Sequence, residues 1–343
     1  MNRTEFKNET ICIFEETYKV TLFFLLGSTS VVAFIENAFF CFAVSFNKKL
    51  HLKSNILVVS LAVTDITIAA ILPNLELVYL YFYPSWPIGS LGTSALNLIW
   101  IFSLVCPFVT VTAITIERCV MIAGKSSWKV FFTKKVYMVI VIFIWLYSFI
   151  CCLVTAVTMQ PAHKNKYIWN VNPTLYYILL SFHIIAPLLL LPGLYYKMKS
   201  ASQNLLKKLM KITENNINLN RQKKEMKLAK TIFIIIGLMY LVWFPVVMIE
   251  ILYNLHFEEC IVSKLGVFSL WMTCINGCLN PLVYSYRNPE VKQFAKCLIN
   301  FFYKKKLIER FAKNRYITPP PSLRSFRDGP DWKEKVIEYG IKI

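Results

Sequence analysis

The chain has 343 residues, of which 56% are hydrophobic and 15% aromatic, and its formal net charge is +19. So apolar a composition exceeds that of an ordinary soluble domain and favours a membrane protein. In a soluble chain the positive charge would suggest nucleic acid as a partner. Here the basic residues follow a pattern that membrane topology explains, so we expect no nucleic-acid partner.

Seven apolar segments are long enough to cross a bilayer as helices, since a span needs about 20 residues. In chain order they are residues 20–46, 55–81, 90–122, 136–158, 174–196, 226–253 and 262–286. An amphipathic segment follows at 289–303. The sequence therefore predicts an all-α membrane protein, a seven-transmembrane helix bundle with a short amphipathic helix after helix seven.

The basic residues predict the orientation of the bundle. Of the 38 Lys and Arg residues, 32 lie in the segments on one side, between helices one and two, three and four, five and six, and after helix seven. The positive-inside rule places these segments in the cytoplasm. We thus expect an extracellular segment at 1–19, a transmembrane domain at 20–286, a membrane-parallel helix at 287–303 and a disordered basic tail at 304–343, with the plasma membrane as the destination.

Covalent modification is predicted on both sides of the membrane. Asn2 and Asn8 begin glycosylation sequons in the extracellular segment. Of the ten cysteines, Cys12 and Cys260 fall in extracellular segments, where we expect them to pair; two unpaired thiols are the alternative. Cys297, in the amphipathic segment, is a candidate for acylation.

Several spans carry polar residues that are costly at membrane depth and are therefore functional candidates. Asn37, Asp65, Asn276 and Asn280 lie in spans one, two and seven. We interpret them as one intramembrane polar network around Asp65. The alternative is that they only join helices, through hydrogen bonds of about 1 kcal/mol each.

A charged group also ends the third span, in the sequence "IERCV". Arg118 needs a partner there, and Glu225 enters span six at a similar depth. Glu117 is adjacent, but neighbouring helical residues do not face each other well. We expect an Arg118–Glu225 pair that joins helices three and six and breaks when helix six moves; a solvated Glu225 is the alternative.

Three later spans contain proline, which removes a helical hydrogen bond and bends or loosens the helix. These are Pro187 in span five, Pro245 beside Trp243 in span six, and Pro281 after Asn280 in span seven. Bends near mid-membrane allow the cytoplasmic halves of the helices to move, as a two-state switch requires.

This ordered set resembles the rhodopsin-like (class A) G-protein-coupled receptors over most of the chain. The resemblance rests on Asn37, "LAVTD" with Asp65, "ERC" around Arg118, Trp145, Pro187 with Tyr195, "WFP" with Trp243 and Pro245, and "NPLVY" with Asn280, Pro281 and Tyr284. The segment "RNPEVKQFAKCL" matches the short membrane-parallel helix of the family.

The resemblance implies a non-enzymatic receptor that binds an extracellular ligand and activates a heterotrimeric G protein by outward movement of helix six. Arg118 would hold the inactive state with Glu117 and Glu225, then swing to meet Tyr195 and Tyr284. Trp243 would be the rotamer-sensitive residue beneath the ligand. Asp65 would lie at the centre of a sodium and water pocket.

The chain departs from the family pattern in its outer half. Thr93 stands where helix three usually begins with a disulfide cysteine, and residues 161–173 contain no cysteine either. Trp100 replaces the aspartate that aminergic receptors use, which argues against a standard monoamine site. Cys274 replaces the retinal-binding lysine of opsins, so we expect no retinal.

Two departures bear on sodium at Asp65. Pro107 and Gly277 stand where the family usually has oxygen donors around that pocket. Sodium is therefore a weak expectation. Glu36 stands where glycine is common, and the sequence offers no account of it.

The ligand pocket is expected in the outer halves of the helices. The candidate residues are Glu76, Asn97, Trp100, His183, Glu250 and Tyr253. Carboxylates around an aromatic floor suit a cationic amine or basic peptide. A lipid ligand and a constitutively active receptor without a ligand are the alternatives.

Other classes of protein are less favoured. A transporter would usually show repeated halves, a channel a pore filter, and an enzyme a nucleophile–base or metal cluster. We also expect membrane lipids to contact the basic segment 197–230, and only weak arrestin recruitment. The tail offers few hydroxyls for phosphorylation, namely Thr318, Ser322 and Ser325.

Overall fold

The computed structural model describes residues 14–82, 87–123, 126–158, 173–212, 216–255, 258–287, 290–300 and 303. Asn2, Asn8, Cys12, most of the 161–173 segment and the predicted tail at 304–343 lie outside the described residues. The backbone of some helices is described without all of its side chains. The side chains of four predicted site residues fall in this group: Glu225, Glu250, Tyr253 and Tyr284.

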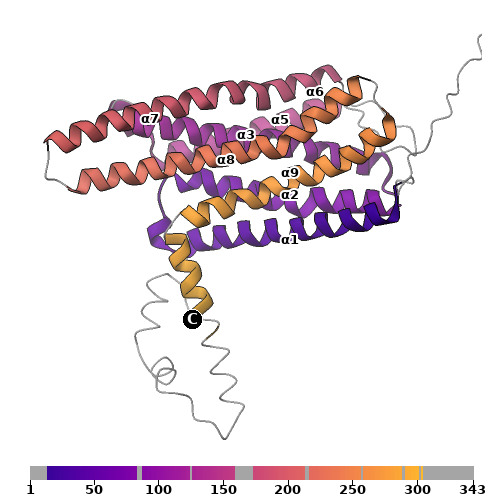
Figure 1. The fold of residues 1–343 in the computed structure, drawn as a ribbon, viewed down its shortest axis with the longest axis horizontal. Coiled ribbons are helices and arrows are strands. Elements are labelled where there is room, and N and C mark those ends of the chain that lie inside the picture. Colours follow the sequence, from indigo (N-terminus) through magenta and orange to yellow (C-terminus); the bar gives the residue numbers. More distant parts are fainter. Residues whose placement is uncertain are drawn as a thin grey trace, which may run out of the picture.

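Long helices run side by side through the described part of the chain (Figure 1). They are α1 (Glu16–Phe46), α2 (Asn55–Phe82), α3 (Gly89–Ala123), α5 (Lys134–Thr158), α6 (Pro173–Leu180), α7 (Ala186–Ile212), α8 (Asn216–Asn254) and α9 (Glu259–Arg287). Two short elements, η1 (Lys48–Leu50) and α4 (Ser126–Phe131), lie in the connections. The predicted seven-helix bundle is confirmed, with α6 and α7 together forming the fifth helix.

Helices five and six extend beyond their predicted ends. Six described helices are long and apolar enough to cross a membrane, whereas the apolar part of α8 is the shorter stretch Phe233–Ile249. Before it, α8 begins at Asn216 with a polar helical sequence that is rich in Lys and Asn. Figure 1 shows α7 and α8 projecting past the neighbouring helices at one end. Hydropathy missed these extensions because a helix, once formed, propagates into water through residues of fair helix propensity.

The third helix is the centre of the bundle. It contacts α2, α5, α7 and α8, while α1 packs against α2 and α9. In the most apolar stretch of α3, 72% of residues are buried, against 22% in those of α1 and α5. The polar groups of α3 therefore lie inside the protein, and the outer faces of α1 and α5 are left to contact lipid.

Two carbonyl groups that lose their helical partner to proline accept hydrogen bonds from side chains of α1. Proline has no N–H, so the carbonyl four residues earlier loses its helical partner. Pro73 frees the carbonyl of Ala69, to which Ser30 Oγ donates at 2.8 Å. Pro281 frees that of Gly277, to which Asn37 Nδ2 donates at 2.8 Å. The first helix thus satisfies backbone groups that lipid could not.

The fifth helix is interrupted by one π-helical segment, η2 (Ser181–Ile185), just before Pro187. The N–H of Ala186 bonds to the carbonyl of Ser181, five residues back. Tyr240 of α8 donates its hydroxyl to the carbonyl of Ile184 at 3.3 Å. The sequence predicted a loosened helix at Pro187, and the structure shows the form that this takes.

A further helix at 290–300 follows α9 and leaves the end of the bundle crosswise (Figure 1). Val291 and Phe294 are fully buried, and the Phe294 ring lies 6.1 Å from Phe39 and 6.0 Å from Phe42 of α1. This helix lies at the position of the predicted amphipathic segment. Cys297 is half-buried on it, and its acylation stays a prediction.

Candidate functional site

At one end of the bundle, a buried ion pair lies on α3. Arg118 Nε is 3.0 Å from Glu117 Oε2, and both side chains are buried. The family resemblance implied Glu117 as a partner of Arg118, and the two side chains do meet, although adjacent helical residues usually face each other poorly. The Cβ atoms of adjacent helical residues diverge, but the long arginine side chain folds back to reach the carboxylate.

A residue that the sequence analysis missed completes this group. Tyr137, near the start of α5, donates its hydroxyl to Glu117 Oε1 at 2.6 Å and is itself buried. A hydrogen bond to a charged acceptor is stronger than a neutral one. Glu117 is therefore held between α3 and α5. A tyrosine at the edge of an apolar segment was the available signal, but periodicity does not say which helix it faces.

Two residues of the predicted polar network, Asp65 and Asn280, are hydrogen-bonded to each other. Asn280 Nδ2 donates to Asp65 Oδ2 at 2.9 Å, and both residues are buried. Asn37 joins through the backbone instead, by its bond to the Gly277 carbonyl. The structure therefore brings α1, α2 and α9 together at one depth.

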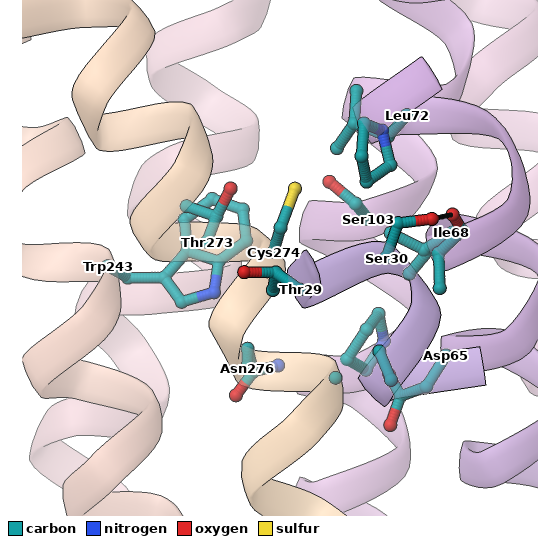
Figure 2. A pocket seen from close by; sticks show the side chains of 15 residues that line it. Thr29, Ser30, Asp65, Ile68, Leu72, Ser103, Trp243, Thr273, Cys274 and Asn276 are labelled. Atoms are coloured by element: carbon teal, nitrogen blue, oxygen red, sulfur yellow. Dashed lines mark hydrogen bonds between the residues drawn. The ribbon is translucent and has the colours of Figure 1, made fainter. Parts of the chain in front are cut away.

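A cavity lies above Asp65, between α1, α2, α3, α8 and α9. Figure 2 shows Thr273 and Ser103 at one end of it, Asp65 and Asn276 at the other, and the Trp243 indole pointing in from α8. Its free volume for a water-sized molecule is about 10 Å³, roughly the space that one water needs. The cavity joins Trp243 to the polar network.

The cavity offers a poor sodium site. Pro107 and Gly277 line it without contributing a side-chain oxygen. Asp65 Oδ2 is taken by Asn280, and in Figure 2 the Asp65 carboxylate points away from the hydroxyls of Ser103 and Thr273. Hard cations need several converging oxygens. The oxygens of Asp65, Ser103 and Thr273 do not converge on one point, so these residues do not fit a sodium ion.

Four described candidates for the ligand pocket are buried inside the bundle: Glu76, Asn97, Trp100 and His183. Both ring nitrogens of His183 have partners within the chain. Nδ1 lies 2.7 Å from the Leu179 carbonyl oxygen and Nε2 lies 3.1 Å from the Tyr147 hydroxyl. With Nδ1–H donating to that carbonyl, Nε2 accepts from Tyr147, so His183 joins η2 to α5.

Aromatic rings link α3 to α8 along the bundle. Trp100 of α3 and Trp243 of α8 have ring centroids 5.5 Å apart, and Phe108 meets Trp243 edge-on at 5.4 Å. Tyr195, the predicted partner of Arg118, is stacked on Phe233 of α8 at 4.1 Å. Trp145, the lone tryptophan of the fourth span, donates to Ser60 of α2 at 2.9 Å.

The beginning of α1 is fastened to the beginning of α9. Tyr18 donates its hydroxyl to the Lys264 carbonyl, and Lys264 Nζ lies 3.5 Å from Glu15 Oε1. Phe14 is buried against Tyr79 of α2. Cys260, at the start of α9, is disulfide-bonded. Its predicted partner, Cys12, lies outside the described residues.

Comparison with known proteins agrees with this geometry. The family model for the seven-transmembrane receptors of the rhodopsin family matches residues 36–284, more than half of the chain. The histamine H2 receptor of Rattus norvegicus is 21% identical over 82% of this chain and 80% of its own length. The melanocortin receptor 5 of Mus musculus is 24% identical over 85% and 87%, and the melatonin receptor type 1A of Phodopus sungorus 22% over 82% and 81%.

The matched residues include Asn37, Asp65, Arg118, Trp243 and Asn280. The chain is thus a multi-pass protein of the plasma membrane, a receptor and not an enzyme. It belongs to the rhodopsin-like (class A) G-protein-coupled receptors.

Proposed function

We propose that this receptor binds a cationic extracellular ligand and activates a heterotrimeric G protein through outward movement of the cytoplasmic half of α8. The observation that carries the switch is the buried Glu117–Arg118 pair, held by Tyr137. A buried ion pair adds little net stability but favours one arrangement over another. Such a group can hold one state and release a charged arginine in the other.

Movement of α8 is supported by Pro245, which lies inside the helix two residues after Trp243 and removes one of its backbone hydrogen bonds. In this proposal the helix pivots there, Glu225 leaves Arg118, and Arg118 turns toward Tyr195 and Tyr284. The Tyr195–Phe233 stack already places Tyr195 against the face of α8 that would move. Because aromatic contacts are less directional than hydrogen bonds, this face can slide without leaving a polar group unpaired.

A cationic ligand is supported by Glu76, a carboxyl group that α2 holds inside the outer half of the bundle. A cationic ligand would complement the negative charge of this carboxyl group. Relatives named for histamine and for melanocortin are consistent with an amine or a peptide. Glu250, Asn97 and Tyr253 remain proposed contacts. A lipid ligand would count against Glu76 as the recognition group.

The remaining assignments are part of the same proposal. The N-terminus lies outside, glycosylated at Asn2 and Asn8, and Cys12 pairs with Cys260. The pairing is supported by the contacts of Glu15 and Tyr18 with Lys264, close to Cys260, and by the free thiols of the eight other described cysteines. Anionic lipids face the basic cytoplasmic segments, Cys297 is acylated, and arrestin is recruited weakly.

The switch is tested by basal G-protein activation per receptor at the cell surface. Arg118→Ala should abolish it, and Glu225→Ala should raise it. Tyr137→Phe should raise it about three- to tenfold, since a hydrogen bond to a charged group contributes about 1.5–3 kcal/mol, of which part differs between the two states.

The matched control is Tyr196→Phe, which removes a hydroxyl from an exposed tyrosine of α7 and should change nothing. If Tyr137→Phe and Glu225→Ala both equal the wild type at equal surface level, the proposed switch is wrong.

The ligand class is tested by comparing Glu76→Gln with wild type in a screen of amines, basic peptides and lipids. Selective loss of responses to cations supports the assignment, and loss confined to lipids contradicts it.

A further inference from the structure

The base of the outer half of the bundle is filled by a side chain of the receptor itself. The indole of Trp100 lies against that of Trp243, with 5.5 Å between ring centroids and 33° between the ring planes. Trp100 is 3% exposed and Trp243 is 2% exposed. No space for a ligand ring is left between them, because each indole covers the other.

Trp243 also contacts a second aromatic ring. Phe108 of α3 meets it edge-on, with the ring planes at 76°, and Tyr240 lies 6.0 Å from Phe108. Tyr240 donates to the Ile184 carbonyl in η2. We call Trp100, Trp243, Phe108 and Tyr240 the aromatic column. It runs between α3 and α8 and ends on the π-helical segment of helix five.

The aromatic column restricts the rotamer of Trp243. A change of its rotamer would lose the face contact with Trp100 and the edge contact with Phe108 at the same time. The Trp243 indole also reaches the cavity above Asp65 (Figure 2). Its position therefore couples the outer half of the bundle to the polar network.

We propose that Trp100 is a built-in occupant of the ligand cavity, which takes the place where a ligand ring would touch Trp243 and holds Trp243 in its present rotamer. A ligand then acts on Trp243 only by moving Trp100, and its charge is recognised above this level. Trp100 is thus a positioning residue that limits basal activation. The inference rests on the proposed function, in which Trp243 belongs to the switch.

The test removes the Trp100 side chain by mutation and then adds indole to the solution as a substitute for it. Trp100→Ala leaves an apolar cavity of about the size of indole, and cavities of this kind bind small aromatic molecules. Losing the ring pair should raise basal G-protein activation per surface receptor about two- to tenfold. Indole added at millimolar concentration, on the order of the weak affinity of a small fragment, should return it toward the wild-type level.

The matched control is Trp271→Ala. Trp271 of α9 donates to Thr29 of α1 and lies outside the aromatic column, so indole should not lower the basal activation of this variant. A second readout does not depend on signalling. Indole should raise the thermal unfolding temperature of purified Trp100→Ala and leave that of the wild type unchanged, because it binds only the cavity.

The outcomes separate the two proposals. If Trp100→Ala signals like wild type at equal surface level, or if indole stabilises the purified variant without reversing its activation, Trp100 only fills space and the inference is wrong. Should the variant fail to reach the surface, Trp100→Phe serves instead: a smaller increase supports the inference, and none contradicts it. If neither wild type nor any variant activates a G protein although indole binds, the proposed function fails while the occupancy of the cavity stands.

Discussion

The two sides of this bundle are held together by different kinds of contact. Along α1, hydrogen bonds join the helix to its neighbours: Ser30 to Ala69 of α2, Asn37 to Gly277 of α9, and Trp271 of α9 to Thr29. Between α3 and α8 the contacts are the rings of the aromatic column. Hydrogen bonds in an apolar medium are directional and costly to break, whereas ring contacts tolerate sliding. We infer that α1, α2 and α9 form the fixed side and that α8 is the helix free to move.

The largest effect is expected from Asn37→Ala. The change removes two hydrogen bonds and leaves the part-buried Gly277 carbonyl, already without its helical partner because of Pro281, unsatisfied. We expect about 2–4 kcal/mol of lost stability, measured by thermal unfolding of the purified receptor. Asn74→Ala is the control, since exposed Asn74 donates to the Ala70 carbonyl of its own helix. Equal losses in both variants would contradict a special role for the α1 contacts.

Phe108→Leu tests the opposite side. It removes the edge contact with Trp243 while keeping an apolar side chain, so we expect basal activation to rise about two- to fivefold, with less than about 1.5 kcal/mol of lost stability. Phe102→Leu is the control on the same helix, because Phe102 contacts Trp145 instead of Trp243. A variant that unfolds readily but signals normally would place Phe108 on the fixed side.

Ser30→Ala should have a smaller effect than Asn37→Ala. It deprives the Ala69 carbonyl, freed by Pro73, of its donor, and we expect about 1 kcal/mol of lost stability with basal activation unchanged. The control is Ser28→Ala, because the exposed Ser28 hydroxyl donates to the Leu25 carbonyl within α1. A clear change in basal activation would show that the α1–α2 contact also belongs to the switch.

The smallest effect is expected from sodium. Replacing Na⁺ by an organic cation at constant ionic strength should change basal activation by less than about twofold, because Pro107 and Gly277 supply no side-chain oxygen to the cavity. Gly277→Ser restores one donor, and a Cβ at this position would meet Ala33 at an ordinary 3.5 Å. A sodium response in the wild type as large as that of Gly277→Ser would show that the cavity rearranges to bind the ion.

The sequence alone predicted many residues of the candidate site, because their residue types are unusual in a spanning helix. An ionisable or amide residue in an apolar segment stands out wherever it is placed, so Asp65, Asn37, Asn280 and Arg118 were found without a structure. The residues that contact them were harder to predict from the sequence. Tyr137, Ser30 and Tyr147 are ordinary residues for a spanning helix, and only the rotation of one helix against another gives them a role.

Hydropathy and charge asymmetry by themselves determined the seven-helix class, the order of the spans and the expected orientation, because the bilayer imposes one length and one polarity on every segment. Proline positions likewise marked the weak points of the helices, since the missing N–H is a property of the residue. Only the tertiary structure decided which donors satisfy the freed carbonyls, that Arg118 folds back onto Glu117, and that Trp100 lies on Trp243. These contacts join residues far apart in sequence, and they depend on helix rotation and rotamers that no local pattern specifies.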